Sequence, residues 1–542
     1  MLELAYILSI ILMLLLPVIL AAGLRRLTPA PWLLFSLGAI TFTLSQVVHI
    51  PLNDWLADLG WLPGETIANL PLWRTALTAG LTAGLCEELA RAASYLFLRK
   101  YRPAWLNLPG SLMLGLGHGG IESMVFGGVL TAATISALLP LRGIDLTQLN
   151  LTSEQLSAIN LQLTAFTSTP WLALQPLLER LLAISAHVTL SLMVWKAFAR
   201  GKLRRDWIYI LVAILYHAAI DYAAVWTSTT YHEQPFAYLG VMLAVLLPGW
   251  AWAIWTIRRH ALTRAQPGPL RGELAVFWVA TLKELRQAWS TKRILVVWAV
   301  FLAFGMLSPL LARFTFEIVS SMEGAEMFAG LIPPPTTVDA MVQYLKNLSQ
   351  FGFILAVLLA MGAVVGEKER RVAPMILSKP MARWAFILSK FAAQLLVYSG
   401  AFFLSALAAY YYTLFLFGPL EIGSFLLLNA LLLLWLLTFV ALSLLGSTLG
   451  KSTVAAGGIG LALCVVLMLA GTLPRWGALL PGGLMAWATL LGQQAAGLSL
   501  GADAATLLSG AATGQGGAAA SALALILLSL VLAVGIFEQQ EI

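Results

Sequence analysis

Residues 4–22 read LAYILSIILMLLLPVILAA, a run without a single charged side chain. A membrane-spanning helix needs about 20 consecutive, predominantly apolar residues. Comparable runs recur along the whole 542-residue chain, which is 60% hydrophobic and only 11% charged, whereas soluble proteins carry about 25% charged residues. The composition therefore excludes a soluble globular protein and a disordered chain, and it predicts an all-α polytopic membrane protein.

The apolar runs predict about 13 membrane spans, seven before a polar break and six after it. The first seven lie near residues 4–22, 33–51, 72–98, 108–139, 177–198, 207–229 and 236–257. The last six lie near residues 293–312, 347–366, 384–417, 423–449, 453–473 and 519–537. No basic segment precedes the first run, which favours an uncleaved anchor over a signal peptide.

The basic residues predict the orientation of the spans. With the N-terminus outside and the C-terminus in the cytoplasm, 25 of the 32 lysines and arginines fall in cytoplasmic segments, as the positive-inside rule requires. The net charge of +7 is then explained by topology and by contact with anionic membrane lipid, and no nucleic-acid partner is needed. The only two cysteines, Cys86 and Cys464, lie far apart in apolar runs, which excludes a disulfide framework.

The polar stretch RRHALTRAQPGPLRGELA at 258–275 predicts a cytoplasmic linker at 258–272. It separates a domain at 1–257 from a domain at 273–542. The first domain carries ionisable residues in mid-span, whereas the charges of the second lie at helix ends and in loops. A charge at the bilayer centre costs about 2.5–3.5 kcal/mol, so intramembrane ionisable residues are functional candidates. The candidates are Glu87, Glu88, Arg91, His118, Glu122, His187, His217 and Asp221.

These candidates share one depth. Glu87, His118, His187 and His217 each lie 10 or 11 residues from the cytoplasmic end of a predicted span, which is about 15 Å at 1.5 Å per residue. Four helices thus deliver polar groups to one level. Imidazoles and carboxylates form the ligand set of a catalytic zinc. The four-residue spacing of His217 and Asp221 suits a carboxylate that orients an imidazole.

Four motifs carry a family resemblance: CEELARA at 86–92, GLGHGGIES at 115–123, AHVTLS at 186–191 and YHAAID at 216–221. In this order they resemble the YhfC-like intramembrane metalloproteases, a branch of a group that includes the PrsW-like and CAAX-processing proteases. The resemblance covers residues 1–257. It implies a zinc hydrolase in which Glu87 activates water, Glu88 is its partner or stabilises the transition state, and Arg91 holds both carboxylates. The implied metal ligands are Glu122, His187 and His217, with His118 as a competitor, and Asp221 orients His217.

The second domain opens with ELAVFWVATLKELRQAWSTK at 273–292, which is typical of an amphipathic helix at the membrane interface. The segment VVGEKERRVAPMILSKPMARWAFILSKF at 364–391 is a compact charged loop between two spans. With the interfacial elbow helix and six following spans, residues 273–542 resemble the type-2 ABC transporter permeases. The resemblance implies that a separate ATPase subunit docks on the loop, at Glu367, Lys368, Glu369 and Arg370. A merely solvated loop remains an alternative.

The stretch LLGSTLGKST at 444–453 approaches a nucleotide-binding loop but does not form one. The pattern GxxxxGK[ST] requires glycine at position 445, where Leu445 stands. We therefore expect the chain itself to bind no nucleotide and ATP hydrolysis to come from another subunit.

Taken together, the sequence predicts a cell-membrane permease subunit of an ABC-type exporter, acting as a homodimer with a separate ATPase. It is fused to a module that hydrolyses a peptide bond within the membrane, in a peptide or lipidated substrate. Three alternatives stay open. The chain is chiefly a protease with a degenerate permease half, or its first domain is a non-catalytic binding or sensing module, or its buried acids and histidines form an ion relay.

Overall fold

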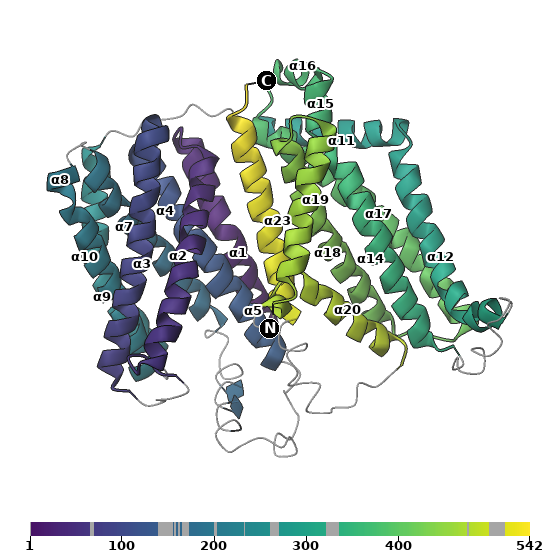
Figure 1. The fold of residues 1–542 in the computed structure, drawn as a ribbon, viewed down its shortest axis with the longest axis horizontal. Coiled ribbons are helices and arrows are strands. Elements are labelled where there is room, and N and C mark those ends of the chain that lie inside the picture. Colours follow the sequence, from purple (N-terminus) through teal and green to yellow (C-terminus); the bar gives the residue numbers. More distant parts are fainter. Residues whose placement is uncertain are drawn as a thin grey trace. The chain divides into compact units, whose positions relative to one another are not determined.

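The fold is entirely helical over the residues that the computed structural model describes (Figure 1). The described residues are 2–541 without the segments 65–69, 139–155, 157–158, 161–162, 165–172, 200–202, 232–233, 261–269, 321–334, 474–475 and 498–514. Within them, 12 helices are long and apolar enough to cross a membrane. Each of the predicted spans coincides with a helix, including α3 (Leu72–Tyr101), whose charged residues keep it out of that set.

Contacts divide the chain into two compact units. One contains Met1–Thr131 and Ser157–Pro267, and the other contains Ala132–Leu156 and Gly268–Ile542. The division at residues 267 and 268 falls inside the predicted linker, much of which lies outside the described residues. The domain bounds 1–257 and 273–542 stay a prediction.

The long helices of the first unit run from purple to teal in Figure 1. They are α1 (Leu2–Leu27), α2 (Trp32–Asp58), α3, α4 (Leu108–Glu122), α7 (Gln175–Ala199), α9 (Ile208–Thr230) and α10 (Pro235–Arg259). Shorter elements are η1 (Pro103–Trp105), α8 (Leu203–Asp206) and the π-helical segment η2 (Ser123–Val129), which continues α4. The next helix, α5 (Leu130–Leu138), belongs to the second unit from Ala132 onward. π-Helical turns are rare and occur frequently at functional sites.

The second unit begins with the predicted interfacial helix, α11 (Leu270–Ser290). Its long helices are α12 (Arg293–Ser320), α14 (Thr337–Met361), α17 (Arg383–Leu416), α18 (Ile422–Leu449), α19 (Thr453–Ala470), α20 (Gly482–Ala495) and α23 (Gln515–Glu538). Short elements are α15 (Val365–Glu369), α16 (Val372–Leu377) and η6 (Gly477–Leu479). Within this unit α11, α15 and α16 lie at the same end of the spans (Figure 1).

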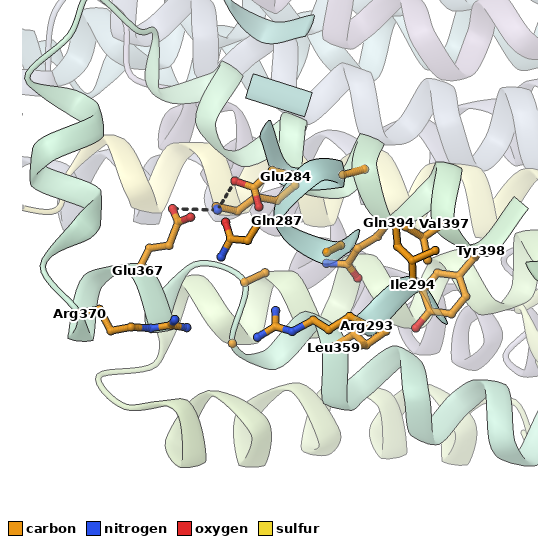
Figure 2. A pocket seen from close by; sticks show the side chains of 15 residues that line it. Glu284, Gln287, Arg293, Ile294, Leu359, Glu367, Arg370, Gln394, Val397 and Tyr398 are labelled. Atoms are coloured by element: carbon orange, nitrogen blue, oxygen red, sulfur yellow. Dashed lines mark hydrogen bonds and ion pairs between the residues drawn. The ribbon is translucent and has the colours of Figure 1, made fainter. Parts of the chain in front are cut away.

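A network of four charged side chains ties α11 to α15 and α17, and Figure 2 labels its two acids, Glu284 and Glu367. Lys283 Nζ lies 2.7 Å from Glu284 Oε1 and 2.6 Å from Glu367 Oε1. Lys390 Nζ lies 2.9 Å from both Glu284 Oε1 and Glu367 Oε2. Because two acids face two lysines, the charges cancel. Burial raises the pKa of Glu284, but Lys390 and Lys283 outweigh it and hold that pKa below its usual range.

We expect Glu284→Gln to lower the stability of the protein at neutral pH by about 1–3 kcal/mol, since Lys390 is left with one carboxylate. An acid whose pKa is lower in the folded protein than in the unfolded chain stabilises the fold at pH values above its unfolded-state pKa. That stabilisation is lost as the pH falls through its folded-state pKa. The difference in melting temperature between wild type and variant should therefore be greatest above about pH 6 and shrink below about pH 4. A difference that persists unchanged into acid would contradict the ionic account.

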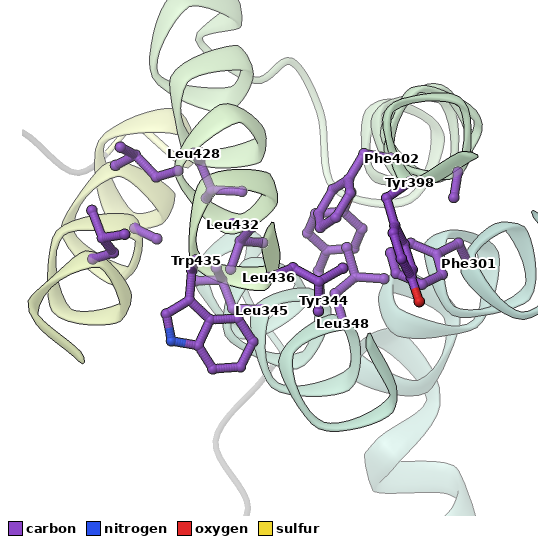
Figure 3. Packing of buried hydrophobic residues seen from close by; sticks show 14 of the residues in the cluster. Phe301, Tyr344, Leu345, Leu348, Tyr398, Phe402, Leu428, Leu432, Trp435 and Leu436 are labelled. Atoms are coloured by element: carbon purple, nitrogen blue, oxygen red, sulfur yellow. The ribbon is translucent and has the colours of Figure 1, made fainter. Parts of the chain in front are cut away.

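The core of the second unit is aromatic and aliphatic (Figure 3). Phe301 of α12, Tyr344 of α14 and Phe402 of α17 are buried in one cluster with leucines of α18. Tyr344 is completely buried and its hydroxyl donates to Asn429 Oδ1 at 2.7 Å, so its polar atom is satisfied inside the cluster. Outward-facing positions on the same helices are also apolar, for example Leu407 and Phe415. Such surfaces suit contact with lipid rather than water.

Candidate metal centre

Helix α9 approaches α3 closely because α3 presents a glycine to it. A Cβ at Gly84 would lie 2.6 Å from the carbonyl oxygen of Ile214 and 3.5 Å from Cβ of His217. Small residues allow such backbone approach between membrane helices. The close approach sets His217 of α9 beside the charged residues one turn further along α3.

Glycine has the same role between α4 and α7. A Cβ at Gly119 would lie 3.0 Å from Cβ of His187 and from Cα of Ile184. The adjacent His118 then reaches the histidine of α7, with ring centroids 4.9 Å apart. The rings of His187 and His217 are 5.3 Å apart. Three imidazoles from three helices therefore meet at one point, and all three are buried.

Arg91 and Glu88 form a buried pair that holds two of these histidines. Both side chains are fully buried, and Arg91 Nη1 lies 2.5 and 2.6 Å from the two carboxylate oxygens of Glu88. Arg91 Nη2 donates to Nδ1 of His187 at 3.0 Å. Glu88 Oε1 accepts from Nδ1 of His217 at 2.8 Å. The pair therefore fixes both ring orientations and leaves the two Nε2 atoms for other partners.

Glu87 lies on the other side of these rings. Its Oε2 is 3.0 Å from Nε2 of His118 and 3.9 Å from Nε2 of His217. Its Oε1 accepts from Nε2 of Gln46 at 3.1 Å. Within the described chain, Nδ1 of His118 has no hydrogen-bond partner although this side chain is fully buried. Glu87 is thus shared between α2, α4 and α9.

Glu87, His187 and His217 form a group with the composition of a metal site. Each offers one ligand atom, the three atoms lie within 4.8 Å of one another, and all three residues are buried. One carboxylate and two imidazoles, with room for water, form a ligand set of catalytic zinc. A carboxylate on the second nitrogen of a ligating histidine, as Glu88 is on His217, is the usual support of such a site. The residues present therefore fit a metal ion.

A cavity of about 80 Å³ opens beside this group. A single water needs roughly 10–15 Å³, so the cavity admits several. Glu122 lines it, contacts Nε2 of His187, and accepts from Nη1 of Arg180 at 2.8 Å. Asp221 also lines it, with Oδ2 at 3.6 Å from Nε2 of His217 and a side chain 34% exposed. Glu179 lines the cavity as well, so three carboxylates border the space where water and substrate would enter.

The structure brings together all eight residues that the sequence singled out in the first domain, but with contacts that differ from those expected. The carboxylate on Nδ1 of His217 is Glu88, whereas Asp221 lies on the Nε2 side. Glu122 and His118 are neighbours of the three-residue group rather than members of it.

Sequence reasoning missed Gln46 and Arg180. Gln46 is an uncharged polar residue in an apolar run, which gives a weak signal. Arg180 lies seven residues before His187 and hence on the same helix face, which was a usable signal.

The predicted docking loop is largely occupied by contacts within its own unit. Glu367 is buried in the charged network. Lys368 donates to the carbonyl oxygens of Thr448 and Gly450 and to Gln540 Oε1. Glu369 accepts from the hydroxyl and the backbone N–H of Thr453.

Beyond these contacts, the loop also presents free surface. Arg370, Arg371 and Met375 are exposed, and Met375 is 68% exposed on α16.

Comparisons with known families match the two halves separately. Residues 12–241 match the family model described as YhfC intramembrane metalloprotease. Residues 278–542 match the model described as ABC-2 family transporter protein. The chain is a fusion of these two families. It is a multi-pass membrane protein. An ABC-2 permease domain implies an ATPase partner and, in general, dimerisation.

Two relatives come from Bacillus subtilis (strain 168). The uncharacterized transmembrane protein YxlG is 26% identical over 194 residues, which cover 35% of this chain and 74% of YxlG. The uncharacterized membrane protein YhfC is 28% identical over 215 residues, which cover 39% of this chain and 79% of YhfC. The two family models confirm the family resemblance of each half.

Proposed function

We propose that the YhfC-like half is an intramembrane peptidase and that Glu87, His187 and His217 hold its zinc ion. The observation that supports this most directly is that α3, α7 and α9 each bring one ligand atom to the same place. The three atoms lie within 4.8 Å of one another, and all three residues are buried. A bound zinc would lower the pKa of a water and polarise the carbonyl of a peptide bond. The cavity beside the group provides the space for both.

The surrounding residues then have definite tasks. Glu88 holds Nδ1 of His217 so that Nε2 faces the ligand group. Arg91 neutralises Glu88 and, by donating to Nδ1 of His187, keeps a proton on Nε2, which lies against the carboxylate of Glu122. A ligand role for that Nε2 requires the proton to move to Nδ1 and Arg91 to turn away from it. The Arg91 guanidinium can stay paired with the carboxylate of Glu88 when it no longer donates to His187.

Glu87 has two candidate tasks, metal binding and activation of water, and its place in the ligand group favours metal binding. A different carboxylate must then accept the proton of the attacking water. Asp221 borders the cavity on the Nε2 side of His217, and its side chain is more exposed than that of Glu122, the other cavity carboxylate that contacts a histidine of the group. We assign it that task.

For the permease half we propose a transport subunit that acts as a homodimer with a separate ATPase. The short helices α15 and α16 join two spans at one end of the unit and expose Arg371 and Met375. An exposed apolar side chain among basic ones suits contact with another protein. The substrate class that fits both halves is a peptide or lipidated peptide, cleaved by the first and exported by the second.

Glu88→Gln is expected to lower the zinc affinity of the purified protein about 10–100-fold, because the carboxylate that orients His217 loses its charge. The measurement is competition with a zinc chelator, followed by metal analysis. Glu179→Gln is the matched control, since Glu179 lines the same cavity but its hydrogen bond is with Gln175. Equal zinc affinity in wild type and Glu88→Gln would contradict the assignment. Glu179→Gln should retain wild-type affinity.

A further inference from the structure

A second cavity lies in the permease half, between the interfacial helix α11 and the ends of α12, α14 and α17 (Figure 2). Its volume is about 70 Å³, where one water needs roughly 10–15 Å³, so it can hold a group of phosphate size. The polar residues that line it are Glu284, Gln287, Arg293, Glu367, Arg370, Lys390, Gln394 and Tyr398. Neither half's proposed activity uses this cavity.

The charges around the cavity do not balance. Glu284 and Glu367 are neutralised by Lys283 and Lys390 in the network described above. Arg293 and Arg370 remain, and Figure 2 shows their guanidinium groups directed toward each other across the cavity. Among the described residues, Arg370 makes one side-chain hydrogen bond, from its Nε to the carbonyl oxygen of Gly366. The guanidinium of Arg293 makes none within that part of the chain. Two facing cations without an acid between them attract an anion.

The inner wall of the cavity carries polar atoms that lack partners. Tyr398 is completely buried, and its hydroxyl has no hydrogen-bond partner among the described residues. Oε1 of Gln394, one turn earlier on α17, is a buried atom that also lacks a hydrogen-bond partner among the described residues, although the Gln394 side chain as a whole is only partly buried. Buried polar groups in proteins almost always have a partner. A ligand with an anionic oxygen and a hydroxyl satisfies both atoms, since the tyrosine donates to the first and the glutamine accepts from the second.

We propose that this cavity binds a phosphate ester, with Arg293 and Arg370 on its anionic oxygens and Tyr398 as a further donor. Guanidinium groups suit phosphate because their planar N–H groups match its oxygens. The ester has two sources. One is the headgroup of an anionic lipid such as phosphatidylglycerol, since α11 is amphipathic and exposes Leu274, Trp278 and Leu282. The other is a soluble phosphate ester such as glycerol 3-phosphate.

The test is native mass spectrometry of the full-length protein after exchange into detergent with either phosphatidylglycerol or glycerol 3-phosphate. Wild type should retain one bound ester per chain. An Arg293→Gln, Arg370→Gln double variant should retain at least about tenfold less bound ester than wild type. The matched control is Arg286→Gln, Lys379→Gln, which removes the same charge from exposed positions at the same end of the unit. It should behave as wild type.

Each outcome decides something. Retention of phosphatidylglycerol alone identifies a lipid site, and retention of glycerol 3-phosphate alone identifies a soluble ligand; both support the cavity as a phosphate site. Tyr398→Phe should weaken retention while the melting temperature stays unchanged, which separates ligand contact from damage to the fold. Equal retention by the double variant and its control overturns the proposal. The zinc site and the ATPase contact are tested by other variants and other measurements, so failure here is distinguishable from failure of the proposed function.

Discussion

A His187→Ala, His217→Ala double variant is expected to carry less than about a tenth of the zinc found in wild type. Both imidazoles belong to the three-residue group whose ligand atoms lie within 4.8 Å, and Glu87 alone leaves a single carboxylate. The measurement is metal analysis of the purified full-length protein after dialysis against excess free zinc and buffer. The same variant should lose any peptidase activity that the wild type shows.

The control is His260→Ala, which removes an imidazole that contacts the carbonyl oxygen of Thr256 and the ring of Trp195, away from the group. It should keep the wild-type zinc content. Retention of zinc by the double variant would show that the metal is held elsewhere. A wild type that binds no zinc, iron or cobalt would favour an ion relay or an inactive binding module over a peptidase.

The second large effect concerns the ATPase. In a Met375→Glu, Arg371→Glu double variant, the amount of cognate ATPase subunit that co-purifies is expected to fall about a hundredfold. The reason is that the substitutions put negative charges into the proposed interface in place of an apolar and a basic contact. Both residues are exposed on the α15–α16 segment. The measurement is the ratio of the two subunits after affinity purification of the full-length chain from membranes.

Two further variants show whether the contact is specific. Arg286→Glu on α11 reverses an exposed charge at the same end of the unit and should leave the subunit ratio unchanged. Glu367→Lys should lower the melting temperature as well as the ratio, because Glu367 is held between Lys283 and Lys390. An unchanged ratio in the Met375 and Arg371 variant would contradict docking on this segment.

The spans were predictable because lipid imposes a simple requirement: about 20 apolar residues for each crossing. Helix α3 is instructive. Its charged residues lower its hydropathy, yet the prediction of a span at 72–98 coincides with Leu72–Tyr101. The apolar flanks define the helix, and the charged residues within it are tolerated because Glu88 and Arg91 neutralise each other in a fully buried pair.

The sequence predicted which residues of the candidate site come together, but it did not predict all the contacts between them. Counting residues along a helix gives depth, and depth placed Glu87, His187 and His217 at one level. The rotation of each helix about its own axis depends on packing, and here on glycines such as Gly84 and Gly119. That rotation placed Glu88, and not Asp221, on Nδ1 of His217.

The charged loop shows a different limit. Its composition indicated a docking surface, but composition cannot distinguish a charge that faces a partner from one that is neutralised within the fold. Glu367 is paired with lysines 84 and 23 residues away in sequence, one on α11 and one on α17. Tertiary pairs of this kind leave no local signal.

The most direct test of the metal centre is X-ray absorption spectroscopy at the zinc edge on the full-length protein. Two histidines and one carboxylate should give a first shell of nitrogen and oxygen at about 2.0–2.1 Å, with the scattering pattern of two imidazoles. Glu87→Gln should change the oxygen shell and leave the imidazole pattern. A first shell with no imidazole, or with sulfur, would contradict the assignment of Glu87, His187 and His217 as the ligands.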